Sequence, residues 1–338
     1  MTSYAMYRLP HSRQIVKITQ TEGLPEELHS YRELNGRSGF VFAPFCVSTS
    51  CPVLLIKPDI TETMPAPECL YTPSPCAPQR HTDSRERDIY ASDFAAFNDA
   101  LQNGRFEKLV LARSSRVKCE GHAQPEQLFM KACRLYPRMF VALVSTPQGG
   151  TWLMATPEIL LCGDAPVFST MALAGTMRLD DSQLGFDTPG NSAGDNAIEW
   201  DDKNRREQAY VAAYIRNRIG SLAYNISRKG PYTARAGRLV HLRTDFTFTL
   251  DDMNILGDVI DCLHPTPAVC GIPKDEARHF IMSHESEERG YYSGFSGPLH
   301  PDGETRLFVS LRCMNIGDDG YRLYAGGGLL RESDEQRE

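Results

Sequence analysis

The pattern of apolar and polar positions predicts many short strands and a few helices. Runs of aliphatic, aromatic and β-branched residues bounded by turn residues are typical of strands. We expect strands over residues 39–45, 52–57, 106–117, 139–145, 151–155, 168–176, 237–250, 306–316 and 321–325. Apolar residues at helical spacing indicate helices over residues 92–104, 125–135, 198–222 and 251–263. Because strands and helices do not strictly alternate, the pattern predicts an α+β fold with large, mostly antiparallel sheets in a sandwich and helices packed outside.

The stretch from Leu263 to Gly294 concentrates the strongest local signals. It opens with His264-Pro265-Thr266-Pro267, where proline fixes φ and biases the preceding residue toward an extended conformation. A helix is expected from Pro273 to no later than Gly290, followed by an aromatic strand and turn. A stiff loop, a helix and a strand would therefore meet and carry His264, Glu285 and Arg289. The alternative is a proline-stiffened connector with surface charges.

Composition excludes several classes of protein. The chain has 338 residues, is 41% hydrophobic and carries a net charge of −7 without a lysine or arginine run. This argues against nucleic acid and against a membrane surface as partners. No apolar run approaches the ~18 residues that span a bilayer, and no signal-peptide core begins the chain. Ten scattered cysteines without a C-x-x-C motif indicate free thiols, so we expect a cytoplasmic protein.

Two titratable residues lie in apolar surroundings. Lys108 stands in the strand 106–117, where burial would disfavour the ammonium and make a general base. The alternative is that Lys108 faces water. Glu158 follows the apolar strand TWLMA, where burial would raise its pKa and make a general acid, whereas a solvated turn glutamate is the alternative.

Three further features could bind ligands. Glu207 lies on a charged helix, and such carboxylates are ligands for Mg²⁺, although charge-rich helix faces are usually solvated. Arg312 stands alone among apolar strand residues, where its guanidinium needs an anion such as a substrate carboxylate. The glycine run 326–328 offers backbone N–H groups to an anion, although by itself it indicates only a turn.

The order of several short segments resembles one enzyme family. The segments are KLVLAR, ATPEILL, LAGT, NRREQAYV, LHPTPAVCG with ERGYYSG, SLRC and YAGGGLL. They resemble the chorismate-utilising enzymes related to anthranilate synthase component I, and most closely the isochorismate synthases of menaquinone and siderophore synthesis. The likeness runs from about Phe94 onward. Before that, only GFVFAPF matches.

The resemblance implies a reaction and roles for residues. Lys108 matches the lysine that activates water in isochorismate and salicylate synthases, where anthranilate and aminodeoxychorismate synthases have glutamine. Glu158 matches the general acid. Ala174 matches the position of a nucleophilic lysine in aminodeoxychorismate synthase, so no covalent adduct is expected. The implied enzyme is an isomerase (a hydroxymutase) that converts the small molecule chorismate to isochorismate with Mg²⁺. The expected substrate-binding residues are Ala174, Gly175, Thr176, His264, Arg289, Tyr292, Arg312, Gly326, Gly327 and Gly328.

The resemblance also bears on metal ligands and domains. Glu207 and Glu285 are the expected metal ligands, and the family's second metal glutamate would lie about three residues beyond Glu338, on a helix missing from the sequence. Residues 1–90 are expected to form N-terminal strands and a linker within the same fold. Residues 91–338 would form the chorismate-binding catalytic domain. We expect a monomer.

Two alternatives to an isochorismate synthase stay open at this point. A salicylate synthase would add lyase activity on the same substrate. A chorismate-binding paralogue without activity is a different class, which the intact Lys108 and Glu158 disfavour and the missing helix favours. The sequence does not distinguish a menaquinone from a siderophore pathway.

Overall fold

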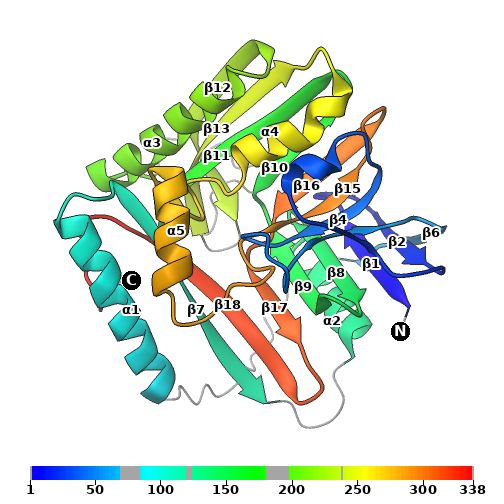
Figure 1. Ribbon diagram of the computed structural model, residues 1–338, viewed down its shortest axis with the longest axis horizontal. Coiled ribbons are helices and arrows are strands. Elements are labelled where there is room, and N and C mark those ends of the chain that lie inside the picture. Colours follow the sequence, from blue (N-terminus) through cyan, green and yellow to red (C-terminus); the bar gives the residue numbers. More distant parts are fainter. Residues whose placement is uncertain (1, 69–83, 119–123, 180–197, 237–238, 337–338) are drawn as a thin grey trace.

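The computed structural model places most of the chain in two nine-stranded sheets (Figure 1). It describes residues 2–68, 84–118, 124–179, 198–236 and 239–336. All strand pairs recorded within both sheets are antiparallel. The predicted fold class, an α+β sandwich of mostly antiparallel sheets, is confirmed.

The first sheet, called sheet A here, combines strands from both ends of the chain. In spatial order it contains β14 (Gly271–Ile272), β7 (Lys108–Lys118), β18 (Gly320–Leu329), β17 (Cys313–Ile316), β9 (Gly150–Thr156), β8 (Phe140–Thr146), β1 (Ser3–Arg8), β2 (Gln14–Gln20) and β6 (Ile60–Pro65). Apart from β14, these strands are long enough to carry a continuous apolar face.

The second sheet, called sheet B, has the same number of strands. Its order is β12 (Tyr224–Ala236), β13 (Leu239–Thr249), β11 (Val167–Arg178), β10 (Ile159–Asp164), β16 (Glu304–Val309), β15 (Phe295–Leu299), β4 (Gly39–Ala43), β5 (Val53–Ile56) and β3 (Glu26–Leu28). The strands of the first 65 residues therefore divide between both sheets.

Helices cover the outer faces of the two sheets. They are α1 (Ser84–Gln102), α2 (Pro125–Leu135), α3 (Asp202–Ile219), α4 (Leu256–Leu263) and α5 (Lys274–His284), with short 3₁₀ turns at Tyr31–Leu34 and Met253–Ile255. α3 and α4 pack on sheet B, α1 and α5 pack beside β7, and α2 packs on β8 and β9. No helix in the described part of the chain is both long and apolar enough to cross a membrane.

One core lies between sheet B and helices α3 and α4, and a second lies where the sheets face each other. Phe42 of β4 stacks on Tyr291 at 3.9 Å between ring centroids, and Phe140 of β8 stacks on Phe308 of β16 at 4.3 Å. All four rings are buried. Burying aromatic side chains of this size supplies a large share of the hydrophobic stabilisation of a core. The two sheets are therefore held together by aromatic stacking across their interface.

The chain crosses from one sheet to the other at two points that matter below. β9 of sheet A leads into β10 of sheet B through the turn that contains Glu158. β16 of sheet B leads into β17 of sheet A through Arg312. The prediction of one strand over 306–316 was therefore wrong, because the chain bends between the sheets in the middle of that apolar run.

Several other predicted elements differ from the structure. α1 begins at Ser84 rather than after Ser92, because its first turns are polar and carry no apolar spacing. The strand β12 was not predicted, because it lies at a sheet edge and is mostly exposed, so its residues do not alternate. Residues 180–198 are rich in glycine, serine and aspartate, a composition that predicts a mobile segment, and residues 180–197 lie outside the described part of the chain.

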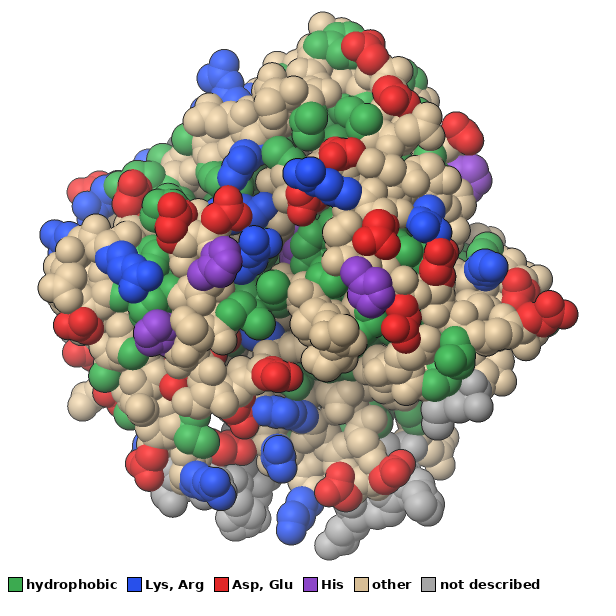
Figure 2. Space-filling view, viewed as in Figure 1, with side chains coloured by type: hydrophobic (Ala, Val, Ile, Leu, Met, Phe, Trp, Pro, Cys, Tyr) green, Lys and Arg blue, Asp and Glu red, His purple; other side chains and the backbone are tan. Residues whose placement is uncertain are grey.

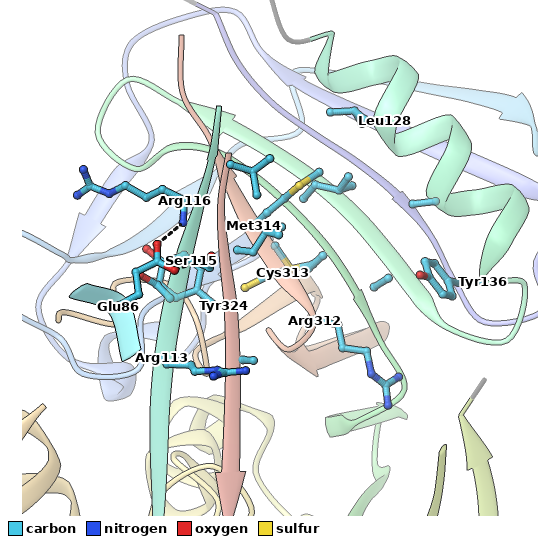
Figure 3. A pocket seen from close by; sticks show the side chains of 18 of the residues that line it. Glu86, Arg113, Ser115, Arg116, Leu128, Tyr136, Arg312, Cys313, Met314 and Tyr324 are labelled. Atoms are coloured by element: carbon cyan, nitrogen blue, oxygen red, sulfur yellow. Dashed lines mark hydrogen bonds between the residues drawn. The ribbon is translucent and has the colours of Figure 1, made fainter. Parts of the chain in front are cut away.

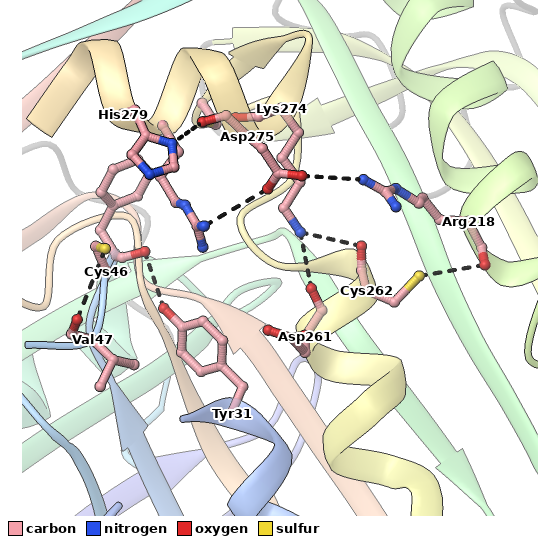
Figure 4. Close-up of polar contacts among 12 residues, drawn as sticks. Tyr31, Cys46, Val47, Arg218, Asp261, Cys262, Lys274, Asp275 and His279 are labelled. Carbon is pink, nitrogen blue, oxygen red and sulfur yellow. Dashed lines mark hydrogen bonds and ion pairs between the residues drawn. The ribbon is translucent and has the colours of Figure 1, made fainter. Parts of the chain in front are cut away.

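Contacts between α4 and α5 fix the loop that contains His264-Pro265-Thr266-Pro267 (Figure 4). Lys274, only 6% exposed, donates hydrogen bonds to the carbonyls of Asp261 and Cys262 at 2.9 and 3.3 Å. Burial lowers the pKa of Lys274 to about 8. Its cation thereby satisfies carbonyl groups at the C-terminal end of α4, which a helix leaves unpaired. Both ends of the loop around Thr266 are anchored in this way.

Candidate active site

The first pair of candidate residues is a buried ion pair between β7 and α3. The Nζ of Lys108 lies 2.7 Å from the Oε1 of Glu207, and the side chains are 1% and 13% exposed. The alternative that Lys108 faces water is therefore excluded. Glu207 points from the inner side of α3, so it does not belong to the solvated face of that charged helix.

Glu158 lies in the turn between β9 and β10 and is 3% exposed. The Oγ1 of Thr266 donates a hydrogen bond to the Oε1 of Glu158 at 3.3 Å. Burial raises the pKa of Glu158 to about 7, against the opposing effect of the nearby charges of Lys108 and Arg312. A carboxyl group with this pKa is substantially protonated at neutral pH and can donate a proton. The turn glutamate is therefore not solvated.

Arg312 occupies the crossing from β16 to β17 with a strained backbone. Its φ is +48°, a left-handed conformation that costs a residue other than glycine on the order of 1–3 kcal/mol. Burial lowers the pKa of its guanidinium. Among the residues that the structure describes, no carboxylate forms an ion pair with Arg312, whose contacts are the Sδ of Met139 and the Nε2 of His241, each at 3.4 Å. A half-buried cation without a carboxylate partner is suited to bind an anionic ligand.

His241 of β13 joins this site and was not predicted. Its Nδ1 lies 3.0 Å from the Oγ1 of Thr176, and burial together with Arg312 lowers its pKa to about 4. The imidazole is therefore neutral at physiological pH. Because Arg312 can only donate, Nε2 accepts and the Nδ1–H donates to Thr176. A lone histidine among the alternating apolar residues of a strand was the available sequence signal.

The backbone around Gly175 is held by side chains of α3. The pairing of β11 with β13 shifts register between Ala174 and Thr176, and Gly175 has a φ of +69°. The amide of Ala174 donates to the Oε1 of Gln208 at 2.9 Å, and the amide of Thr176 donates to the Oδ1 of Asn204 at 3.0 Å. The helix that carries Glu207 therefore also fixes this bulge.

The glycine run lies within β18 rather than in a turn. β18 pairs with β7 from Gly320 to Leu329, and this pairing includes the three glycines. The pairing of β18 with β17 on its other side ends at Leu323. A Cβ atom at Gly328 would lie 3.0 Å from the Oε1 of Glu207 and 3.1 Å from the Cε of Lys108. A Cβ atom at Gly326 would lie 2.6 Å from the hydroxyl of the buried Tyr292. Glycine is needed here because these side chains approach the strand closely.

A methyl group at Gly328 is expected to disturb the Lys108–Glu207 pair. We expect Gly328→Ala to lower kcat/KM by at least about tenfold, because small displacements of catalytic groups have large effects on rate. Steady-state kinetics would measure this, and thermal unfolding would show whether the fold is retained. Gly317→Ala is the matched control, since its Cβ atom would meet only ordinary contacts of 3.6 Å and more. Equal kinetics for both variants would contradict the close approach.

Two predicted binding groups lie away from this cluster. His264 is fully buried against Tyr31 and Phe295, with its Nε2 3.3 Å from the carbonyl of Pro44. Burial lowers its pKa to about 3. His264 packs in the core in this structure, and its role in lining the substrate pocket stays a prediction. Its neighbour Thr266 reaches the site.

Glu285 and Arg289 form a buried ion pair with each other. Arg289 donates to both carboxylate oxygens of Glu285, and to the carbonyls of Val110 and Val269 at 2.7 Å each. Glu285 also accepts from the amide of Ala112 at 2.8 Å. In this structure the oxygens of Glu285 accept from Arg289 and Ala112, and Arg289 donates to Glu285 and to the backbone. A metal-binding role for Glu285 and a substrate-binding role for Arg289 stay predictions. The pair supports β7 behind the site.

The described residues supply one carboxylate for a metal rather than a complete site. Within them, no group of three or more histidine, cysteine, aspartate or glutamate side chains is arranged to hold a metal ion. Because Gly328 has no side chain, space remains next to the carboxylate oxygens of Glu207. One carboxylate alone does not make a magnesium site.

Comparisons with known proteins agree with this arrangement. A family model described as "Chorismate binding enzyme" matches residues 61–338. The chain is 31% identical over 244 residues to isochorismate synthase MenF of Escherichia coli, covering 70% of this chain and 54% of that protein. It is 28% identical over 261 residues to the salicylate biosynthesis isochorismate synthase of Pseudomonas aeruginosa, covering 77% of this chain and 53% of that protein. The chain spans about half the length of these curated relatives.

A solved structure shows the same fold. The menaquinone-specific isochorismate synthase MenF of Escherichia coli superposes with a TM-score of 0.77 at 22% identity, covering all of this chain and 85% of that one. The shared architecture includes both sheets, since the superposition extends over the whole chain.

Proposed function

Because this chain belongs to the family of chorismate-binding enzymes, we propose that it converts chorismate to isochorismate, as an isomerase of the hydroxymutase type. The observation that carries the proposal is the joint burial of a lysine and a carboxyl group at the seam of the two sheets, Lys108 and Glu158. The charge of Lys108 acts on the pKa of Glu158, so the two side chains lie in the same region of the molecule. The reaction requires one base and one acid.

The proposed chemistry adds water at C2 of the ring and removes the hydroxyl at C4. Lys108, as the neutral amine, takes a proton from water while the water oxygen bonds to C2. The ring double bonds shift, the bond from C4 to oxygen breaks, and Glu158 donates a proton to the departing hydroxyl. One water enters and one leaves, so the sum is an isomerisation. Lys108 then holds a proton that Glu158 has lost, and exchange with solvent restores both groups.

The substrate's carboxylates determine how it binds. Arg312 is proposed to hold one carboxylate through its two-pronged guanidinium, oriented by His241. The amide of Gly175 and the free edge of β18 at Gly326 to Gly328 are proposed to donate further hydrogen bonds. Ala174 and Thr176 are proposed to contact the substrate on either side of Gly175, while their own amides stay bonded to Gln208 and Asn204. Tyr292 is proposed to bind substrate at the edge of the site, because its hydroxyl lies close to Gly326. Since Ala174 offers no amine, no covalent adduct forms on the ring there.

We propose that the enzyme uses Mg²⁺, and the described residues supply one ligand for it. Glu207 is the described residue that would bind it, and the metal would neutralise and position a substrate carboxylate. The described residues alone do not complete the site, so no step is derived through the ion. The ion pair of Glu207 with Lys108 must open before Lys108 is neutral and Glu207 is free.

Product analysis tests the proposed function directly. The purified chain is incubated with chorismate and Mg²⁺, and the products are separated by chromatography and identified by mass and absorbance. Isochorismate is the expected product. Salicylate with pyruvate would instead identify a salicylate synthase, and unchanged chorismate at all Mg²⁺ concentrations would identify a binding protein without activity.

The pH dependence of turnover is expected to follow Glu158. Because its pKa is raised to about 7, the protonated acid is lost as the pH rises through that value. We therefore expect kcat/KM to fall by about tenfold per pH unit on the alkaline side, as for a single essential acid of the free enzyme. A kcat/KM–pH profile between pH 5 and 9, at substrate concentrations below KM, measures this. A profile that stays flat to pH 9 would contradict the role of Glu158 as the acid.

A further inference from the structure

A cavity of about 1110 Å³ opens on the outer face of sheet A and does not include Lys108 or Glu158 (Figure 3). Its walls are β7 and β18 on one side, β9 and β17 on the other, and α1 and α2 at the rim. It forms where β18 separates from β17, because their pairing covers only Tyr321 to Leu323. This volume is slightly above the usual range of small-molecule sites.

The charge of this cavity is opposite to that of the whole chain. Six cationic residues line it, namely Arg87, Arg113, Arg116, Lys118, Lys131 and Arg312, together with the single carboxylate of Glu86. Both oxygens of Glu86 already accept hydrogen bonds, from the Oγ of Ser115 and the amide of Arg116. In a protein with a net charge of −7, this is a local positive field. Figure 2 shows several Lys and Arg side chains at the lower end of the molecule, with Asp and Glu side chains among them.

The inner end of the cavity leads to the candidate active site. Arg312 lines the cavity, and its Nη2 also lies 3.4 Å from His241 in the site. Ala325 lines the cavity and directly precedes the glycine run. Ala155 also lines it and lies three residues before Glu158. The cavity and the site therefore share Arg312 and adjoin along two strands.

Arg113 faces Arg312 from the opposite wall of the cavity. In Figure 3 the side chain of Arg113 extends from β7 across β18 toward the end where Arg312 lies. Arg113 is exposed, and its guanidinium lies over the ring of Tyr90 at 5.4 Å. Within the described part of the chain it forms no ion pair, so its charge is available to a ligand.

We propose that this cavity is the entrance for a small ring compound with two carboxylates, and that Arg113 binds one carboxylate first, before Arg312 receives it. The inference rests on the proposed function for the identity of the substrate. The apolar side chains of Leu153, Met314 and Leu323 line the cavity and suit the carbon skeleton of such a ring. The cations attract a dianion, and the successive guanidinium groups bring it from the rim to the seam of the sheets.

Kinetics at different ionic strengths test this route. Arg113→Gln is expected to lower kcat/KM by about five- to tenfold at 0.01 M ionic strength, where electrostatic attraction extends ~30 Å, and to have little effect at 1 M, where it extends ~3 Å. kcat should change by less than about twofold, because Arg113 does not take part in the chemistry. Arg113→Lys should restore most of the salt dependence, since it keeps the charge.

A matched control separates the cavity from general surface charge. Lys229→Gln removes an exposed cation from β12, outside the cavity, and is expected to leave kcat/KM within about twofold. If Arg113→Gln and Lys229→Gln have equal effects, the entrance lies elsewhere. A loss in kcat with unchanged KM would also overturn the proposal, because it would place Arg113 in the chemistry or the fold.

A binding measurement keeps this inference apart from the proposed function. Calorimetric titration with isophthalate, a ring with two carboxylates, is compared with titration by benzoate, which has one. The wild-type chain is expected to bind isophthalate more tightly, and Arg113→Gln to weaken that binding at low salt. If chorismate is not converted but this pattern holds, the proposed function fails and the anion entrance stands. Equal isophthalate affinity in Arg113→Gln and Lys229→Gln would overturn the entrance.

Discussion

Replacing Lys108 by alanine is expected to abolish the formation of isochorismate while the chain stays folded. The amine is the buried base to which the proposed mechanism assigns the proton of water, and general-base catalysis contributes about 10²- to 10⁴-fold. We therefore expect kcat to fall by at least two orders of magnitude. Product formation followed by chromatography, with thermal unfolding monitored in parallel, measures both effects.

Lys274→Met is the matched control for this variant, since Lys274 is another buried lysine outside the site. It removes the cation that satisfies the carbonyls of α4, so stability should fall. Because Lys274 acts on the site only through the loop that carries Thr266, turnover per folded molecule should fall far less than in Lys108→Ala. Retained isochorismate formation in Lys108→Ala would remove Lys108 from the mechanism.

Replacing Glu158 by glutamine is expected to lower turnover by orders of magnitude with little change in substrate affinity. The amide keeps the shape and can still accept from Thr266, but it cannot donate a proton to a leaving hydroxyl. Chorismate binding, measured by titration calorimetry, should be retained. Normal turnover in Glu158→Gln would show that the acid is another group or solvent.

The same substitution has a second consequence, for stability. The pKa of Glu158 is raised above its ordinary value, so its favourable contribution to folding is complete below pH ~4.5 and is lost as the pH rises through about 7. One pKa unit corresponds to about 1.4 kcal/mol. Glu158→Gln removes the ionisation, so its melting temperature relative to wild type should be higher at pH 8 than at pH 5. An unchanged difference would contradict the burial of an ionisable carboxyl.

Sequence reasoning located the chemistry better than the surroundings of the site. Lys108 and Glu158 could be found because each interrupts an apolar run, and an interrupted run predicts burial. The roles of Glu285 and Arg289 remain predictions, because a sequence does not reveal whether two charges four residues apart are paired to each other or to a ligand. The same holds for His264, since burial in a core and burial in a pocket give the same pattern.

The geometry at Arg312 could not be predicted from local patterns. The run from Arg306 to Ile316 is continuously apolar around Arg312, and nothing in it marks the change of sheet or the left-handed backbone. That change depends on which strands accept β16 and β17, and these partners, β10 and β9, lie some 150 residues earlier in the chain. Likewise, Asn204 and Gln208 are helix residues whose function depends on a bulge in a distant strand.

Because the first strands belong to both sheets, some of them must wait for partner strands that the ribosome makes much later. β4 lies between β5, which follows it closely, and β15, which is made only near the end of translation. Bacterial and eukaryotic ribosomes add roughly 5–20 residues per second, so the free edge of β4 stays without its partner for many seconds. Non-local strand pairing of this kind folds slowly and exposes strand edges that can pair with other chains. The nascent protein therefore depends on protection of its N-terminal third until β15 emerges.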